Sequence, residues 1–149
     1  MKQLYEKCLG LYKKYKETIL YLVFGGLTTL INIVAFWALN KLFVLSMDKD
    51  AALMVSNAAA WVISVLFAFV TNKLFVFESK SLHIGLVLKE LVLFVAARLF
   101  SGALDMGIMY LFVSILGFNE LLIKILSNIL VIIINYVLSK LIIFKKKPQ

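Results

Sequence analysis

Four apolar runs, each close to the length of helix that crosses a lipid bilayer, dominate this 149-residue chain. The runs cover residues 19–39, 51–71, 91–116 and 121–139. A hydrocarbon core about 30 Å thick needs roughly 20 apolar residues of helix. Because 63% of all residues are hydrophobic and 16% are charged, a soluble domain of this size would have too little polar surface to cover its outside. The sequence therefore predicts an all-α membrane protein with four transmembrane helices in a single membrane domain, residues 1–149.

One sequence pattern closes two of these runs. Residues 69–77 (FVTNKLFVF) align with residues 136–144 (YVLSKLIIF) when the sequence is shifted by 67 positions. The shift brings Lys73 onto Lys140, and it matches aromatic residues at both ends of the pattern. A repeat with this period indicates that a unit of two helices has been duplicated. We therefore predict two parallel two-helix repeats that enter the membrane in the same direction.

Lysine residues gather on one side of the predicted membrane. The N-terminal tail holds five lysines, the segment between the second and third spans holds three, and the C-terminal end holds four. The other two connections hold three in total, Lys41, Lys49 and Lys124. By the positive-inside rule, both termini are predicted to be cytoplasmic, with basic tails over residues 1–18 and 140–149. Since the lysines behind the net charge of +8 flank apolar spans, no nucleic-acid partner is expected.

Amide and hydroxyl side chains recur on one face of the predicted second and fourth helices. Asn57 and Ser64 are seven residues apart, as are Asn128 and Asn135, and the first span contains Asn32. Lipid offers such groups no hydrogen-bond partner, so we expect them to face the bundle interior or a wet cavity. They either hold neighbouring helices together or line a polar path, and the sequence leaves both possibilities open.

Two charged residues, Arg98 and Asp105, interrupt the third apolar run. Each charge costs at least roughly 2.5–3.5 kcal/mol at that depth, so each needs compensation. Seven residues of helix separate the two by about 10 Å along the axis, which is too far for a direct bond. Arg98 either snorkels or pairs with Glu90, or it binds a phosphate through its planar guanidinium. Asp105 either pairs with Asn32 or Asn128, or it holds sugar hydroxyls or a proton.

Three cations are predicted to meet at the cytoplasmic rim of the membrane. Lys73 and Lys140 occupy the same place in the repeated pattern, and Arg98 lies toward the cytoplasmic side of the third span. A lysine at the cytoplasmic end of a membrane helix is ordinary and also suits the negative helix C-terminus. Its repetition favours a further role, in which the three cations form a basic collar that holds a lipid phosphate while the lipid chain stays in the bilayer.

Several short motifs occur in a specific order along the chain. They are residues 21–32 (YLVFGGLTTLIN), residues 69–77, Arg98, Asp105 and residues 135–144. Their order, spacing and doubled layout resemble the GtrA-like family of four-helix membrane proteins. The resemblance covers nearly the whole chain.

The resemblance implies that the protein is a multi-pass protein of the cell membrane that moves a polyprenyl-phosphate-linked sugar across it. The sugar would serve the glycosylation of teichoic acid or another cell-surface polysaccharide. One glycosyltransferase would make the lipid-linked sugar on the cytoplasmic side, and another would use it outside. The positions carried over from the resemblance include Asn32, Asn72, Lys73, Arg98, Asp105, Asn135 and Lys140. Together with Asn128 from the polar face of the fourth span, the expected substrate-binding residues are Arg98, Lys73 and Lys140 for the lipid phosphate, and Asp105, Asn32, Asn72, Asn135 and Asn128 for the sugar or a polar seam.

The sequence contains no Walker motif and no metal-ligand spacing, so we expect neither a cofactor, nor a metal, nor an enzymatic activity. Movement would then be downhill, driven by consumption outside, or coupled to a proton through Asp105. An alternative function is that of an assembly subunit, which activates or tethers a glycosyltransferase and transports nothing. Four short helices enclose little interior, so a homo-oligomer is also compatible with the sequence.

Overall fold

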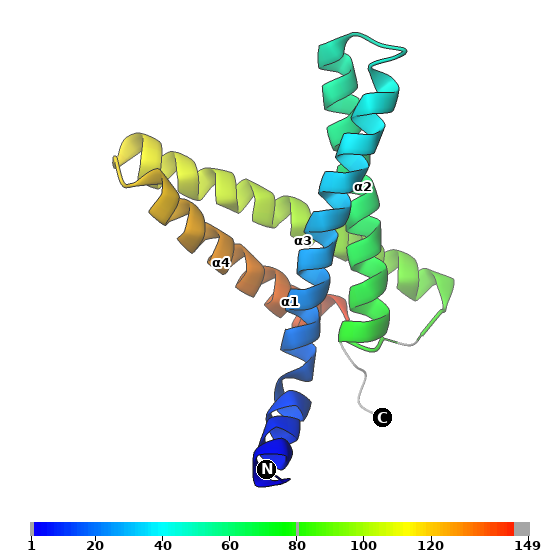
Figure 1. Cartoon of the computed structure of the whole chain (residues 1–149), viewed down its shortest axis with the longest axis vertical. Helices are drawn as coiled ribbons and strands as arrows, with labels where there is room; N and C mark the ends of the chain where they lie inside the picture. The colour runs from blue at the N-terminus through cyan, green and yellow to red at the C-terminus, as the bar shows by residue number, and fades with distance from the viewer. Residues whose placement is uncertain (1, 80, 145–149) are drawn as a thin grey trace. The chain divides into compact units, whose positions relative to one another are not determined.

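A computed structural model describes the backbone of residues 2–79 and 81–144, and the side chains of residues 15–79 and 81–144. Within these residues it contains four α-helices and three short π-helical segments (Figure 1). In chain order they are α1 (Lys2–Phe43), α2 (Lys49–Thr71), η1 (Asn72–Val76), α3 (Ile84–Met109), η2 (Tyr110–Ile115), α4 (Glu120–Leu138) and η3 (Ser139–Ile143). The all-α prediction is confirmed for this part of the chain.

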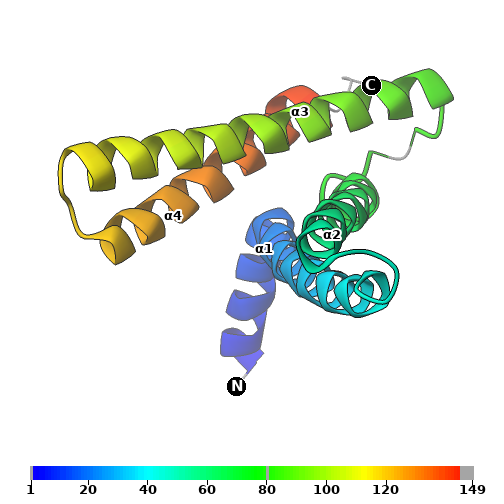
Figure 2. The same ribbon diagram turned by 90° about the horizontal axis from the view of Figure 1, so that it is seen from above.

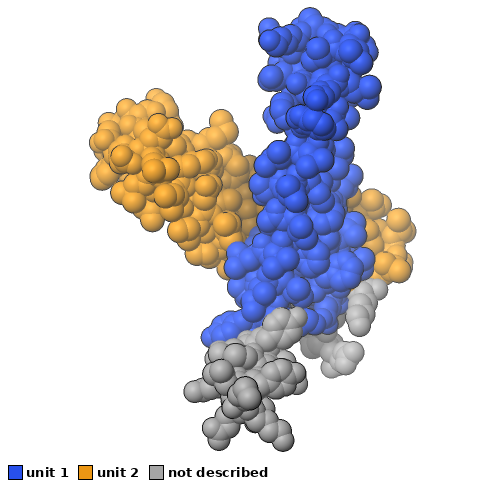
Figure 3. Space-filling view, in the orientation of Figure 1, with its two compact units in different colours: residues 1–78 blue, residues 79–149 orange. Residues whose placement is uncertain are grey.

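The chain divides into two compact units, residues 1–78 and residues 79–149, which Figure 3 shows in different colours. In the N-terminal unit α1 runs beside α2, and in the C-terminal unit α3 runs beside α4 (Figures 1 and 2). Each unit is therefore a helical hairpin. Asp48 starts α2 by accepting a hydrogen bond from the backbone N–H of Ala51 at 3.0 Å. Asn119 starts α4 in the same way through the N–H of Leu122, also at 3.0 Å, so each hairpin turns at a capped helix start.

Three helical stretches are long and apolar enough to cross a membrane, Tyr15–Phe43, Lys49–Val76 and Glu120–Ile143. They contain the predicted first, second and fourth spans. The predicted third span falls on α3 and η2, which are not among these stretches. The crossing of the membrane by this third span, the repeat and the orientation in the membrane stay predictions.

The predicted N-terminal tail and the first span form one continuous helix, because α1 begins at Lys2 and ends at Phe43. The side chains of the first 14 residues lie outside the described residues. The same holds for Lys80 and for the lysines of residues 145–149. Most of the predicted cytoplasmic anchors are thus untested as side chains.

Small residues form the buried face of α2. Ala52, Ser56, Ala60, Ser64 and Ala68 recur every four residues, and each is at most 4% exposed. Side chains four residues apart share one helical face, and small ones let a neighbouring backbone come close. The face belongs to the packing of α2 in its hairpin, since Ser64 bonds across to Asn32 of α1.

Both hairpins end in a π-helical turn that an aromatic residue closes. The backbone N–H of Phe77 donates to the carbonyl of Asn72 at 2.9 Å, and that of Phe144 donates to the carbonyl of Ser139 at 2.8 Å. Phe77 packs on Tyr21 of α1, with ring centroids 6.3 Å apart. Phe144 packs in the same manner on a ring of α3. Because π-helical turns are rare and frequently lie at functional sites, the two ends are candidates for the functional site.

Candidate functional site

The π-helical end of the N-terminal hairpin holds two of the predicted site residues. Asn72 and Lys73 are both 3% exposed. The side-chain amide of Asn72 donates to the backbone carbonyl of Ala68 at 2.6 Å. Its carbonyl oxygen is buried and accepts no hydrogen bond among the described residues. A buried acceptor without a partner costs free energy. A hydrogen-bond donor from a ligand would remove this cost.

Lys140, the sequence counterpart of Lys73, has different surroundings. It is exposed at the π-helical end of the C-terminal hairpin. Its ammonium donates to the hydroxyl of Tyr136 at 3.1 Å and lies 5.3 Å from the centre of the same ring. The repeated lysines are therefore not equivalent, since one is buried and the other lies at the surface.

Farther along the N-terminal hairpin, Asn32 bridges the two helices. Its side-chain amide donates to the hydroxyl of Ser64 at 3.3 Å. That hydroxyl in turn donates to the backbone carbonyl of Trp61 at 2.8 Å. Asn57, which was expected in the same seam, is exposed. The seam of this hairpin is neutral and short.

Arg98 is half-buried on α3, and its guanidinium carbon lies 5.0 Å from the centre of the Phe94 ring. Phe94 is 1% exposed and packs on Phe144, with ring centroids 6.1 Å apart. The carboxylate of Glu90 accepts from Ser79 at 2.8 Å and makes no ion pair with Arg98. Within the described part of this unit, Arg98 has no carboxylate partner at all. The ring orients the guanidinium and leaves its donors open to an anion.

One turn from Arg98, an amide and a hydroxyl join α3 to α4. The side-chain amide of Asn135 donates to the hydroxyl of Ser101 at 3.0 Å, and both residues are 2% exposed. The carbonyl oxygen of Asn135 accepts no hydrogen bond among the described residues. Among the described residues, buried carbonyl oxygens without a hydrogen-bond partner thus belong to Asn40 and Asn72 in the first hairpin and to Asn135 in the second.

Asp105 joins α3 to α4 through two strong bonds. One carboxylate oxygen lies 2.6 Å from the ammonium of Lys124, and the other accepts from the hydroxyl of Ser127 at 2.7 Å. The expected pairing with Asn128 is wrong, because Asn128 is exposed on α4. The rotation of α4 about its own axis explains this. Lys124 and Ser127 lie on the face of α4 that contacts α3, and Asn128 lies outside that face. Asn32 belongs to the other unit, so its pairing with Asp105 stays a prediction.

Lys124 is the site residue that the sequence analysis missed. It was counted with the outer connections, yet it lies in the second turn of α4. A usable signal existed, since Lys124 falls inside the apolar run of residues 121–139 and is charged. A charge at such a position calls for a partner in the same membrane layer.

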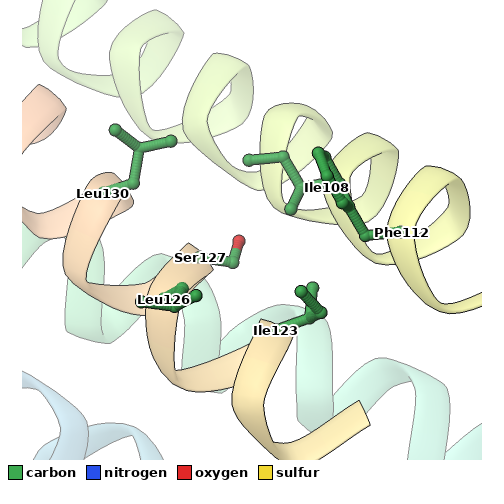
Figure 4. A pocket seen from close by; sticks show the side chains of 6 residues that line it. All are labelled: Ile108, Phe112, Ile123, Leu126, Ser127 and Leu130. Carbon is green, nitrogen blue, oxygen red and sulfur yellow. The ribbon is translucent and has the colours of Figure 1, made fainter. Parts of the chain in front are cut away.

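An open groove of about 300 Å³ lies between the two helices of the C-terminal hairpin (Figure 4). The residues that line it are Ile108, Phe112, Ile123, Leu126, Ser127 and Leu130. Ser127 is the polar member of this set, and its hydroxyl is the group that bonds Asp105. The groove is thus apolar along its walls and is linked to a charged pair at one point.

The three cations of the predicted basic collar are divided between the two units. Arg98 and Lys140 lie in one unit and Lys73 in the other. The collar remains a prediction.

Among the side chains that the structure describes, no group of three or more His, Cys, Asp or Glu residues could hold a metal ion.

Comparison with known proteins supports the resemblance inferred from the motifs. Residues 20–144 match the family model of the GtrA/DPMS transmembrane domain. The chain is 43% identical over 129 residues to the cell wall teichoic acid glycosylation protein GtcA of Listeria monocytogenes (strain EGD-e), covering 87% of this chain and 85% of the relative. It is 41% identical over 145 residues to GtcA of Listeria innocua, covering 97% and 96%. It is also 41% identical over 130 residues to the membrane protein YwcD of Bacillus subtilis, covering 87% and 98%. The chain therefore belongs to the GtrA/DPMS transmembrane domain family and is a multi-pass membrane protein with three to four transmembrane helices.

Proposed function

We propose that this protein moves a polyprenyl-phosphate-linked sugar across the cell membrane for the glycosylation of teichoic acid or another surface polysaccharide. Two relatives carry teichoic acid glycosylation in their names. The observation that carries the proposal is the state of Arg98. It is a permanent cation in an apolar helix, it is oriented by a buried ring, and it has no carboxylate partner in the described part of its unit. A phosphate supplies the missing charge and accepts two parallel hydrogen bonds.

Polar groups along the hairpins could bind the sugar head group of the proposed substrate. A sugar head group crosses a bilayer only if protein groups replace the water that it loses. The unused carbonyl oxygens of Asn72 and Asn135 are acceptors for sugar hydroxyls. In our proposal Asn32 and Asp105 extend this polar path, and Lys73 and Lys140 hold the phosphate at the cytoplasmic rim.

The proposal includes a doubled architecture with cytoplasmic termini. Each unit is a hairpin, and its second helix ends in a five-residue π-helical turn, at Asn72–Val76 and at Ser139–Ile143. These turns fall on the two segments whose sequences align. The lysine distribution puts both turns on the cytoplasmic side, and it makes α3 a membrane crossing that runs in the same direction as α1.

The transport is proposed to be non-enzymatic, and it needs two glycosyltransferases as partners. One supplies the lipid-linked sugar on the cytoplasmic side, and the other consumes it outside and so pulls the movement forward. A proton taken up at Asp105 is the other source of drive. Copies of the chain would add a lateral path if they form homo-oligomers.

The test is a reconstitution assay with purified protein in liposomes that contain a polyprenyl-phosphate-linked sugar. A membrane-impermeant probe reports how fast outer-leaflet substrate becomes inaccessible. We expect wild-type protein to accelerate this exchange and Arg98→Ala to lose most of the acceleration, because hydrogen bonds to a charged group contribute about 1.5–3 kcal/mol. Arg98→Lys should retain part of it, since the charge remains but the planar fork is lost.

The matched control is Lys41→Ala, which removes an exposed cation that lies 4.1 Å from the centre of the Trp37 ring. Lys41 and Trp37 form a cation–aromatic pair on another helix, like that of Arg98 and Phe94. The variant that removes this pair should transport like wild type. Exchange by folded Arg98→Ala at the wild-type rate would contradict the proposed role of Arg98. No acceleration by folded wild-type protein would instead favour the assembly-subunit function.

A further inference from the structure

The charged pair of the C-terminal hairpin has a feature that packing alone does not require. The ammonium of Lys124 makes one hydrogen bond, to Asp105, and its side chain is 44% exposed. The carboxylate of Asp105 is better covered, with a side-chain exposure of 22%, and it is also held by Ser127. An ammonium has three donors, so Lys124 keeps two of them for another acceptor. Asp105 is therefore the fixed member of the pair, and Lys124 is the accessible one.

The pair is linked directly to the groove of about 300 Å³ on the same hairpin. Ser127 lines the groove and bonds Asp105, and Ile123, next to Lys124 in sequence, lines it as well. Five of the six lining residues are apolar (Figure 4). A ligand that fits both features has an apolar chain for the groove and an anionic head for the ammonium.

We propose that Lys124 and this groove form a second binding site, separate from Arg98, that takes the phosphate and the first chain units of an isoprenoid phosphate lipid. The choice of ligand rests on the proposed function. Asp105 keeps Lys124 in place while the site is empty, and the incoming phosphate draws the ammonium away from it. The four-carbon stem of lysine gives the ammonium the reach for this exchange.

The location of this site gives it a separate role from Arg98. Asp105 lies seven residues after Arg98 on α3, which is about 10 Å along a helix axis. One phosphate cannot contact both Arg98 and Lys124 over that separation. A lipid-linked substrate that crosses the membrane would meet the two cations one after the other, Arg98 toward one side and Lys124 toward the other.

Native mass spectrometry of the detergent-solubilised full chain tests the site. The probe is an isoprenyl monophosphate without a sugar, so that the proposed sugar contact of Asp105 does not enter the measurement. Inorganic phosphate and the corresponding neutral prenol are the comparison ligands. We expect Arg98→Ala to retain one bound probe molecule, and Arg98→Ala/Lys124→Gln to lose about tenfold or more of that affinity.

Asp105→Asn separates a binding role of Lys124 from a structural one. In this variant the amide oxygen still accepts from Ser127, while the negative charge that competes for Lys124 is gone. In the Arg98→Ala background it should therefore bind the probe several-fold more tightly. The double change Asp105→Asn/Lys124→Gln removes the charge of both members of the pair, and it should bind no better than Lys124→Gln. If Asp105→Asn and Lys124→Gln both weaken binding equally, the pair is structural and the proposal is wrong.

A bulky residue tests the groove itself. Leu126 lines it, whereas Ile129 on the same helix is exposed and lies outside it. We expect Leu126→Trp to weaken binding of the prenyl phosphate, and Ile129→Trp to leave binding unchanged. Equal binding of inorganic phosphate and prenyl phosphate would overturn the lipid assignment. If transport fails in liposomes while this binding pattern holds, the proposed function is wrong and the site stands. If transport depends on Arg98 and no variant of Lys124 alters binding, the site is wrong and the function stands.

Discussion

The two hairpins of this protein have the same layout and different means of holding their helices together. In the N-terminal hairpin, α2 packs through a stripe of small residues, and the bond between Asn32 and Ser64 is neutral. In the C-terminal hairpin, the bonds between α3 and α4 include a carboxylate and an ammonium. The N-terminal hairpin does have an ion pair, between Lys16 and Glu78 at 3.1 Å, but both side chains are more exposed, at 47% and 42%, than the 22% of Asp105. Because charges in a membrane are costly, the partly covered pair of the second hairpin fits the binding role proposed for it.

The largest expected effect concerns the ring that supports Arg98. Phe94→Ala removes a side chain that is 1% exposed and packs on Phe144, and such a cavity costs about 3–5 kcal/mol. Unfolding in mixed detergent–SDS micelles, followed by circular dichroism, measures it. Phe100→Ala is the control, because Phe100 lies on the same helix and is 58% exposed. Equal losses for both variants would mean that Phe94 does not anchor this hairpin.

The charged pair comes next. Asp105→Leu leaves Lys124 without its partner, and we expect about 1–3 kcal/mol of lost stability from the unpaired charge. Asp105→Leu/Lys124→Leu removes both charges and should recover most of this loss, because apolar side chains of similar volume often replace an ion pair without loss of stability. The same unfolding measurement on the two variants gives the answer. A double variant that is less stable than the single one would show that the pair holds the hairpin together.

A smaller effect compares two asparagines. Asn32→Leu removes a bond between helices in the N-terminal hairpin, and we expect a loss of about 0.6 kcal/mol. Asn135→Leu also removes a bond, but it removes a buried unpaired acceptor with it, so the two changes offset each other to within about 1 kcal/mol. Transport by Asn135→Leu should nevertheless fall. A variant that loses stability and keeps transport would assign Asn135 to packing alone.

The smallest effect tests the predicted sugar contact at Asn128. The residue is exposed on α4 and has no side-chain hydrogen bond in the described structure. We expect Asn128→Ala to change stability by less than about 0.5 kcal/mol and to leave transport intact. The liposome assay, with Asn135→Ala measured in parallel, checks this. If folded Asn128→Ala lost transport, Asn128 would belong to the polar path that contacts the sugar.

Three of the helices could be located from the sequence, whereas most of the polar contacts between helices could not. The runs at 19–39, 51–71 and 121–139 lie inside helices that are long and apolar enough to span a membrane. Helical hydrogen bonds are local, and hydrophobic length is a property of one segment, so both are readable from sequence. The partner of Asp105 was wrong for the opposite reason. It depends on the rotation of α4 against α3, and a rotation of one residue decides whether Asn128 or Ser127 faces the carboxylate.

The sequence by itself determined the all-helical membrane class, the family, and the presence of Arg98 and Asp105 within the third apolar run. Only the tertiary structure decided that Lys73 is buried while its counterpart Lys140 is exposed, and that Lys124 pairs with Asp105. Hydrophobicity follows from composition within about 20 residues. The partner of a charge follows from which faces of two helices meet, and neither helix contains that information alone.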